Sequence, residues 1–186
     1  MIPVGYMAKN VVSKPEWLKT DRVFDLYSIS NCMSDNFADY IQYWKHNGYW
    51  FFDSPYIILS LSAENNINLN NTKLFFYEVY ELEYDEKKQE WRIFKPETTF
   101  LTDVKQPENK KLEGFDIATF FTGNEPQCSP LSCNALAETI ITNEHCLIKS
   151  LDEAKKLLET FPFNKSEPGP FRIFAVYSVE WPVNDL

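Results

Sequence analysis

The fold is decided by the stretch Val79-Tyr80-Glu81-Leu82-Glu83-Tyr84, which is followed 97 residues later by Val176-Tyr177-Ser178-Val179-Glu180-Trp181, a second stretch of the same pattern. From Tyr80 and from Tyr177 onward, apolar or aromatic residues alternate with polar ones, as is typical of a strand with one buried face. We expect one strand from Leu74 to Tyr84 and the other from Phe171 to Trp181. The repetition indicates two related units in one chain.

Working outward from these strands, residues 32–64 align with residues 128–160 at a constant offset of 96 and without a gap. Further upstream, at an offset of 91, Phe24-Asp25-Leu26 falls on Phe115-Asp116-Ile117. We therefore interpret the chain as two divergent copies of one unit. The gap-free alignment places Cys32 on Cys128, Asn47 on Asn143, Ser54 on Ser150 and Leu61 on Leu157.

Each copy is predicted to run strand, helix, short strand, helix, strand. The first copy comprises a strand at 22–28, a helix from Ser34 to Asn47, a short strand at 49–52, a helix opened by Ser54-Pro55 and the strand 74–84, which turns into a hairpin partner at 91–94. The second comprises a strand at 115–122, a helix opened by Ser129-Pro130, a short strand at 145–148, a helix capped by Ser150 and Glu153, and the closing strand 171–181.

This order predicts an α+β fold with a mainly antiparallel or mixed sheet and a pseudo-twofold axis between the copies. The first unit spans residues 1–94, a connecting seam spans 95–112, and the second unit spans 113–186. The copies either form separate domains or share one sheet. Sharing a sheet is the more economical arrangement, because a unit of this size buries little core alone.

The composition limits which kinds of molecule the protein can bind. The 186 residues carry a net charge of −9 and a sequence pI near 4.8, and Arg occurs three times. Nucleic acid and anionic membranes are therefore excluded as direct partners, since both need clustered Lys and Arg. The N-terminal residues lack the features of a signal peptide, the longest apolar runs are too short to span a bilayer, and four cysteines do not make a disulfide scaffold. We expect a cytoplasmic protein.

Cysteine and histidine are the first candidates for chemistry. Cys128 and Cys133, followed by the adjacent pair His145-Cys146, suggest a zinc site by residue type. Neighbouring side chains of a strand point to opposite faces, so His145 and Cys146 do not easily share one ion. We expect no metal and no cofactor. An alternative hypothesis is a Cys–His enzyme. Cys128 would be its nucleophile, because the N-terminal end of the helix that follows lowers a thiol pKa, and His145 would be the base.

Two carboxylates occupy matching places in the predicted first strands. Asp25 and Asp116 would form a pair under pseudo-symmetry, sharing a proton or holding a cation; the alternative is that each faces solvent or binds backbone amides. The phosphate-binding, zinc-protease and hydrolase motifs are absent from the sequence.

The strongest surface feature is an acidic strip on the long strand and its turn. Its negative charges could attract a basic protein partner over a long range. The alternative is an ordinary solvent-exposed sheet face, which has the same sequence pattern. Tyr43 lies off the apolar stripe of its predicted helix and is a candidate anchor at an interface. The residues of the acidic strip are Glu78, Glu81, Glu83, Asp85 and Glu86.

These features favour a non-catalytic module that binds another protein, of the immunity or inhibitor type that neutralises a basic toxin or nuclease. The alternative is a small enzyme or ligand-binding protein with its pocket between the two units. Its residues would be Asp25, Asp116, Cys128 and His145. We expect a monomer or a small homo-oligomer.

Overall fold

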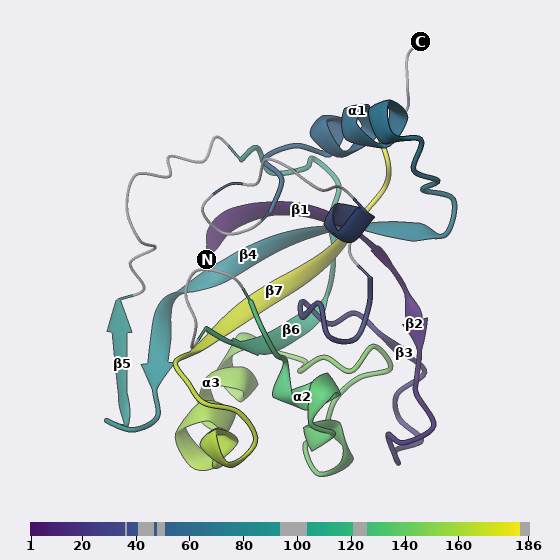
Figure 1. The fold of residues 1–186 in the computed structure, drawn as a ribbon. Coiled ribbons are helices and arrows are strands. Elements are labelled where there is room, and N and C mark those ends of the chain that lie inside the picture. Colours follow the sequence, from purple (N-terminus) through teal and green to yellow (C-terminus); the bar gives the residue numbers. More distant parts are fainter. Residues whose placement is uncertain (36, 41–46, 48–50, 94–103, 121–125, 183–186) are drawn as a thin grey trace.

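The computed structural model describes residues 1–35, 37–40, 47, 51–93, 104–120 and 126–182 (Figure 1). The described chain is a mixed α+β fold built on a mainly antiparallel sheet and three α-helices. Four strands lie in the order β1–β4–β7–β6, and β5 pairs with the C-terminal end of β4. Their bounds are β1 (Ile2–Asn10), β4 (Thr72–Asp85), β5 (Glu90–Ile93), β6 (Lys111–Thr119) and β7 (Phe171–Val179).

The two strands that carry the repeated pattern lie at the centre of the sheet. β4 and β7 pair antiparallel, with Tyr77 opposite Val176. Both are rich in large apolar side chains that are buried, and β-branched and aromatic residues pack well on a pleated surface. The prediction of strands here is confirmed, as is that of a hairpin, because β4 turns into β5.

Two helices begin at predicted caps. In α1 (Pro55–Asn65) the Ser54 hydroxyl accepts a hydrogen bond from the amide of Tyr56, and in α3 (Leu151–Thr160) Ser150 accepts from Glu153. α1 lies against β1, whereas α3 lies against β6 and β7 on the other side of the sheet centre (Figure 1). Both helices are confirmed.

The outer strands β1 and β6 each contain an irregular glycine. Gly5 has a φ of 131° and Gly114 a φ of 151°, and a shift of pairing register occurs at each. A Cβ atom at Gly5 would lie 2.5 Å from the carbonyl oxygen of Phe52, and one at Gly114 would lie 2.9 Å from that of Ile148. Glycine is therefore required for the close approach of a second segment to each strand.

An asparagine side chain in each of these segments is hydrogen-bonded to the backbone of the neighbouring outer strand. Asn47 donates to the carbonyl of Val4 at 2.7 Å, and Asn143 donates to that of Glu113 at 2.7 Å. The segments then touch the outer strands through single bridges at Phe52 and Ile148. The predicted short strands at 49–52 and 145–148 are therefore reduced to bridges among the described residues.

The first predicted strand of the first copy is wrong. Of residues 22–28, only β3 (Asp25–Leu26) is a strand, and it pairs with β2 (Val12–Ser13) outside the main sheet. The outer strand on that side is β1, where no strand was expected from the sequence. Asp25 and Asp116 therefore do not occupy equivalent strands, since Asp116 lies in β6.

Of the two remaining predicted helices, one is described only in part and the other is shorter than expected. Residues Phe37–Tyr40 form a 3-10 helix, and 41–46, which include Tyr43, lie outside the described residues. α2 (Pro130–Cys133) makes a single turn, because Ala135 adopts the left-handed conformation with a φ of 58°. Two more 3-10 helices follow, Leu136–Glu138 and Phe163–Lys165.

A candidate three-cysteine metal centre

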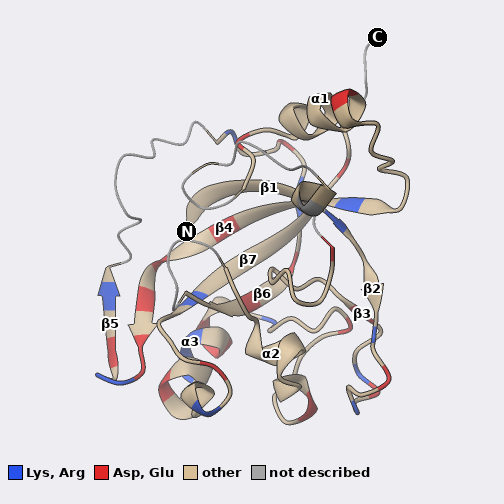
Figure 2. Cartoon of the chain, viewed as in Figure 1, with Lys and Arg blue, Asp and Glu red and all other residues tan. Residues whose placement is uncertain are grey.

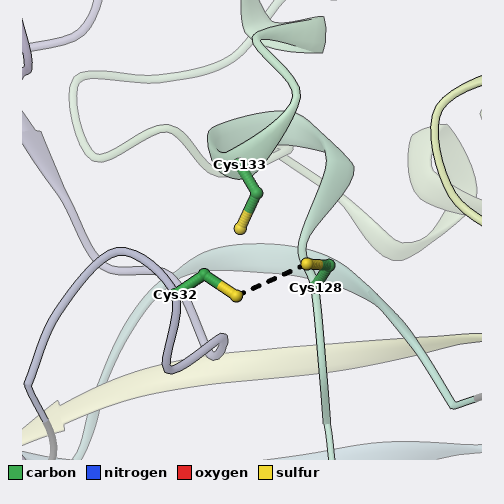
Figure 3. A group of neighbouring side chains, drawn as sticks. All are labelled: Cys32, Cys128 and Cys133. Atoms are coloured by element: carbon green, nitrogen blue, oxygen red, sulfur yellow. Dashed lines mark hydrogen bonds between the residues drawn. The ribbon is translucent and has the colours of Figure 1, made fainter. Parts of the chain in front are cut away.

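Three cysteines from two distant parts of the chain converge beside β6. Cys32 lies in the segment that follows β3, Cys128 precedes α2, and Cys133 ends α2. The Sγ atoms of Cys32 and Cys128 are 3.4 Å apart, and the three sulfur atoms all lie within 4.8 Å of one another. Figure 3 shows the three side chains directed toward one another from the loop and the two ends of the helical turn.

The short helix brings two of the thiols together. The amide of Cys133 donates to the carbonyl of Ser129 at 2.8 Å, closing a single helical turn. Cys128 and Cys133, five positions apart, therefore stand at opposite ends of that turn. Because Ala135 reverses the backbone directly afterwards, the helix ends here and Cys133 remains at its end.

A buried carboxylate joins the two segments that carry the thiols. Asp116 is 1% exposed, and its Oδ1 accepts from the Ser129 hydroxyl at 2.5 Å. Its Oδ2 accepts from the amide of Ile29 at 2.9 Å and from the Ser28 hydroxyl at 3.3 Å. Burial raises the pKa of Asp116, and the bonds from Ser129 and Ile29 oppose the rise. The Asp116 side chain thus holds residues 28–29, which precede Cys32, beside Ser129 at the start of α2.

A second set of bonds fixes the loop of Cys32. Lys9, on β1, donates to the carbonyls of Ser28 at 2.6 Å and Ser30 at 3.0 Å. The Ser30 hydroxyl donates to the carbonyl of Gln127 at 2.6 Å and accepts from the amide of Cys32 at 3.1 Å. The Cys133 thiol also lies 3.4 Å from the Ser30 oxygen. The thiols are therefore positioned by buried polar contacts on both sides.

The electrostatics disfavour a free thiolate. Burial raises the pKa of Cys128 strongly, and the hydrogen bond with Cys32 raises it further. Burial also raises the pKa of Cys133, although bonds from Ser30 and the Ser129 backbone oppose this. A catalytic thiol needs the opposite shift. Cys128 is thus a poor candidate for the nucleophile of a Cys–His enzyme.

The geometry suits one soft cation. Three thiolates around a tetrahedral Zn²⁺, with Zn–S bonds near 2.3 Å, stand about 3.8 Å apart, close to the spacing of these sulfur atoms. Thiolates select soft or borderline ions such as Zn²⁺ and Cu⁺. Cys32 is exposed, so a fourth ligand has access from solvent. The chemistry of the donor set fits a three-thiolate centre with one open position.

The other predicted site residues form a separate cluster. His145 contacts Asp25 through Nδ1, its Nε2 lies 3.8 Å from Glu113, and its ring stacks on Tyr27 with centroids 3.9 Å apart. Burial would raise the pKa of Glu113, but hydrogen bonds from Ser178 and Lys111, with the charges of Lys111 and His145, lower it. The structure thus brings Asp25 to His145 but neither to Cys128, and Asp25 and Asp116 do not pair.

The acidic strip is less open than its sequence suggests. Glu78 and Glu83 are buried; Glu78 pairs with Lys110 at 2.6 Å, and Glu83 pairs with Arg172 at 3.0 Å and with Arg92. Figure 2 shows acidic residues along β4, the strand to which Glu78 and Glu83 belong.

The remaining acids of the strip differ in exposure. Asp85 binds Arg92 at 3.2 Å, Glu86 is buried, and Glu81 is exposed. Internal cations thus neutralise much of the strip. Its role in partner binding stays a prediction, as does that of Tyr43, which lies outside the described residues.

A groove crosses the end of the central strand pair. Its volume is about 740 Å³, and it is lined by residues 72–74, 108–111 and 178–181. His145, Asp25, Asp116 and Cys128 are not among the lining residues. The residues expected in a pocket between the units therefore lie elsewhere in the described chain.

Sequence reasoning missed Cys32 as a partner of Cys128 and Cys133. The signal was present, because the gap-free alignment set Cys32 on Cys128. Cys146, which the zinc hypothesis included, is instead 2% exposed and belongs to an apolar core that also contains Leu131 and Ile148. The three-cysteine group is the one set of possible metal ligands found among the described residues.

Comparison with protein-family models, with curated proteins and with solved structures found no match for this chain. Within the described ranges, no helix has both the length and the apolar character needed to cross a bilayer. The site geometry alone therefore carries the functional argument.

Proposed function

We propose that this protein binds one soft cation, such as Zn²⁺, through the thiolates of Cys32, Cys128 and Cys133. The observation that carries the proposal is the convergence of three sulfur atoms within 4.8 Å from segments 96 residues apart in sequence. Buried hydrogen bonds of Asp116 and Lys9 hold the segments that carry these thiols in place. The function is ion binding rather than thiol catalysis.

Removal of single cysteines tests the proposal. Reduced, metal-free protein is titrated with Zn²⁺ against a chromophoric chelator, and with Co²⁺, whose thiolate complexes absorb in the near ultraviolet. We expect one ion per chain. Cys32→Ser, Cys128→Ser and Cys133→Ser should each lose most of the affinity, because each removes a ligand. A parallel titration with Cu⁺ under anaerobic conditions decides which soft ion is preferred.

Cys146→Ala is the matched control. Cys146 is buried and is not one of the three grouped ligands, so this variant should bind one ion like the parent protein. Absence of binding by the parent protein, or equal loss in Cys146→Ala and Cys128→Ser, would refute the proposal. The proposal also requires reduced thiols, in agreement with the cytoplasmic location expected from the sequence.

We further propose that the chain arose by duplication, with units β1–α1–β4 and β6–α3–β7 about a pseudo-twofold axis. Three observations support this. Gly5 faces Tyr77 on β4, and Gly114 faces Val176 on β7. Tyr77 and Val176 are themselves partners in the antiparallel centre, as equivalent positions beside a twofold axis would be. Serine-capped helices precede both inner strands. An experimental structure in which the two units fail to superpose would refute the duplication.

Binding of a basic protein is a second candidate function. It is supported by the net charge of −9 and by the exposed Glu81 on β4. A complex of this kind should weaken as ionic strength rises. Capture of partners at low salt, repeated with Glu81→Lys, separates it from ion binding, since Glu81 is exposed on β4 and is not one of the grouped metal ligands. A complex indifferent to salt and to Glu81→Lys would count against it.

A further inference from the structure

We infer that Cys32 and Cys128 form a reversible disulfide when the protein meets a hydroperoxide, and that this disulfide releases the bound ion. The inference rests on the proposed function and adds redox control to the same site. It starts from the distance of 3.4 Å between the two sulfur atoms. A disulfide requires about 2.05 Å, so the two sulfur atoms have only a short distance to close.

The accessibility of the thiols sets the order of events. Cys32 is exposed, whereas Cys128 is half-buried. A small peroxide therefore reaches Cys32 first. Cys128 is placed to attack the oxidised Cys32, since the two segments are already joined by the bond from Ser30 to the carbonyl of Gln127. Cys133 is held toward Ser30 instead.

The chemistry balances with a hydroperoxide as the oxidant. The Cys32 sulfur attacks one peroxide oxygen, the O–O bond breaks, and the other oxygen leaves with a proton as water or an alcohol. The resulting sulfenic acid is attacked by the Cys128 sulfur, which forms the S–S bond and expels water. The two thiols together lose two electrons and two protons, and the peroxide gains them. An external thiol restores both cysteines by exchange.

Oxidation removes two of the three ligands. Only Cys133 then remains as a thiolate, and a single thiolate does not retain Zn²⁺ against a chelator. The ion is consequently released on oxidation and bound again on reduction. Asp116 and Lys9 hold the same segments in both states, because their contacts go to the backbone and to serine hydroxyls rather than to sulfur.

The experiment treats the full chain, loaded with Zn²⁺, with hydrogen peroxide. Chromophoric chelator records the released zinc, and mass spectrometry of a non-reducing digest maps the disulfide. We expect release of the one bound equivalent, a link between Cys32 and Cys128, and recovery of binding after dithiothreitol. Cys146→Ala should behave like the parent protein. Cys133→Ser should still form the disulfide, whereas Cys32→Ser should not.

The same oxidation of metal-free protein separates the two proposals. Failure of the reduced protein to bind zinc, together with a link between Cys32 and Cys128 after oxidation of the metal-free protein, would refute ion binding and leave the thiol–disulfide couple supported. Zinc binding followed by a Cys128–Cys133 link, by irreversible oxidation of Cys32, or by no release would overturn the redox inference while the ion site stands. Formation of the link without zinc release would overturn it equally.

Discussion

The hydroxyl of Ser129 donates a 2.5 Å hydrogen bond to the carboxylate of Asp116, at the residue that directly follows Cys128. The other carboxylate oxygen accepts from the amide of Ile29, three residues before Cys32. In Asp116→Asn one of these oxygens becomes an NH₂ group that faces a donor. We expect zinc affinity to fall about 10- to 100-fold, as for other residues that orient metal ligands. The chelator titration measures this.

Asp21→Asn is the control for this substitution, because Asp21 is exposed. It should leave the affinity unchanged. Near-ultraviolet circular dichroism establishes that Asp116→Asn is folded at the temperature of the titration. A folded Asp116→Asn protein with parental zinc affinity would show that the carboxylate does not position the cysteines.

The elements that the sequence predicted correctly are those with local signals. Ser54-Pro55 and Ser150 mark helix starts through their own side chains, and the central strands carry long apolar runs. β1 was missed because Pro3, Gly5 and Lys9 interrupt its apolar pattern. The interruptions have tertiary causes: Gly5 admits the segment at Phe52, and Lys9 binds carbonyls of the loop 28–30.

The site was also harder to predict, because it too depends on tertiary contacts. Neither its closest contact, between Cys32 and Cys128, nor the link of Asp116 to Ile29 has a local sequence signal. The helix expected after Ser129 also ends early. Ser129 makes no side-chain cap bond, since its hydroxyl is used by Asp116. Long-range polar bonds thus overrode the local signal for a helix at Ser129-Pro130.

Alanine at either irregular glycine should destabilise the fold. A Cβ at Gly5 would lie 2.5 Å from the Phe52 oxygen, and one at Gly114 would lie 2.7 Å from the Leu147 Cβ, while both positions have φ above 130°. We expect Gly5→Ala and Gly114→Ala each to lower the free energy of unfolding by more than about 2 kcal/mol. Urea denaturation measures both, and a loss below about 1 kcal/mol would contradict the argument.

Asn143 should contribute more to stability than a surface asparagine. Its Nδ2 donates to the Glu113 carbonyl at 2.7 Å, and its Oδ1 accepts from the amides of His145 and Leu147 at 3.0 Å each. Asn143→Ala leaves these backbone groups unpaired and should cost about 2–3 kcal/mol of unfolding free energy. The exposed Asn109 supplies the control variant, Asn109→Ala. Equal denaturation midpoints for the two variants would refute the role of Asn143.

The last prediction concerns the buried carboxylate of Glu86. Burial raises its pKa above the ordinary 4.5, although hydrogen bonds from the backbone of Asn164 and Phe163 oppose the rise. Its Oε2 has no hydrogen-bond partner among the described residues. The folded state therefore holds the proton more tightly than the unfolded state. As pH rises from 4.5 through the folded-state pKa, ionisation of Glu86 lowers the free energy of unfolding. Above the folded-state pKa this destabilisation is complete and no longer changes with pH.

Glu86→Gln removes this titration while an amide oxygen still accepts from the backbone. We expect the variant to be more stable than the parent protein at neutral pH, with a difference that shrinks as pH falls and levels off below 4.5. Urea denaturation between about pH 4 and pH 8 measures the difference. Glu81→Gln, an exposed change on β4, the strand that ends just before Glu86, should follow the parent protein throughout. A difference for Glu86→Gln that grows toward acid pH would show that the carboxylate is stabilised by its surroundings rather than destabilised by burial.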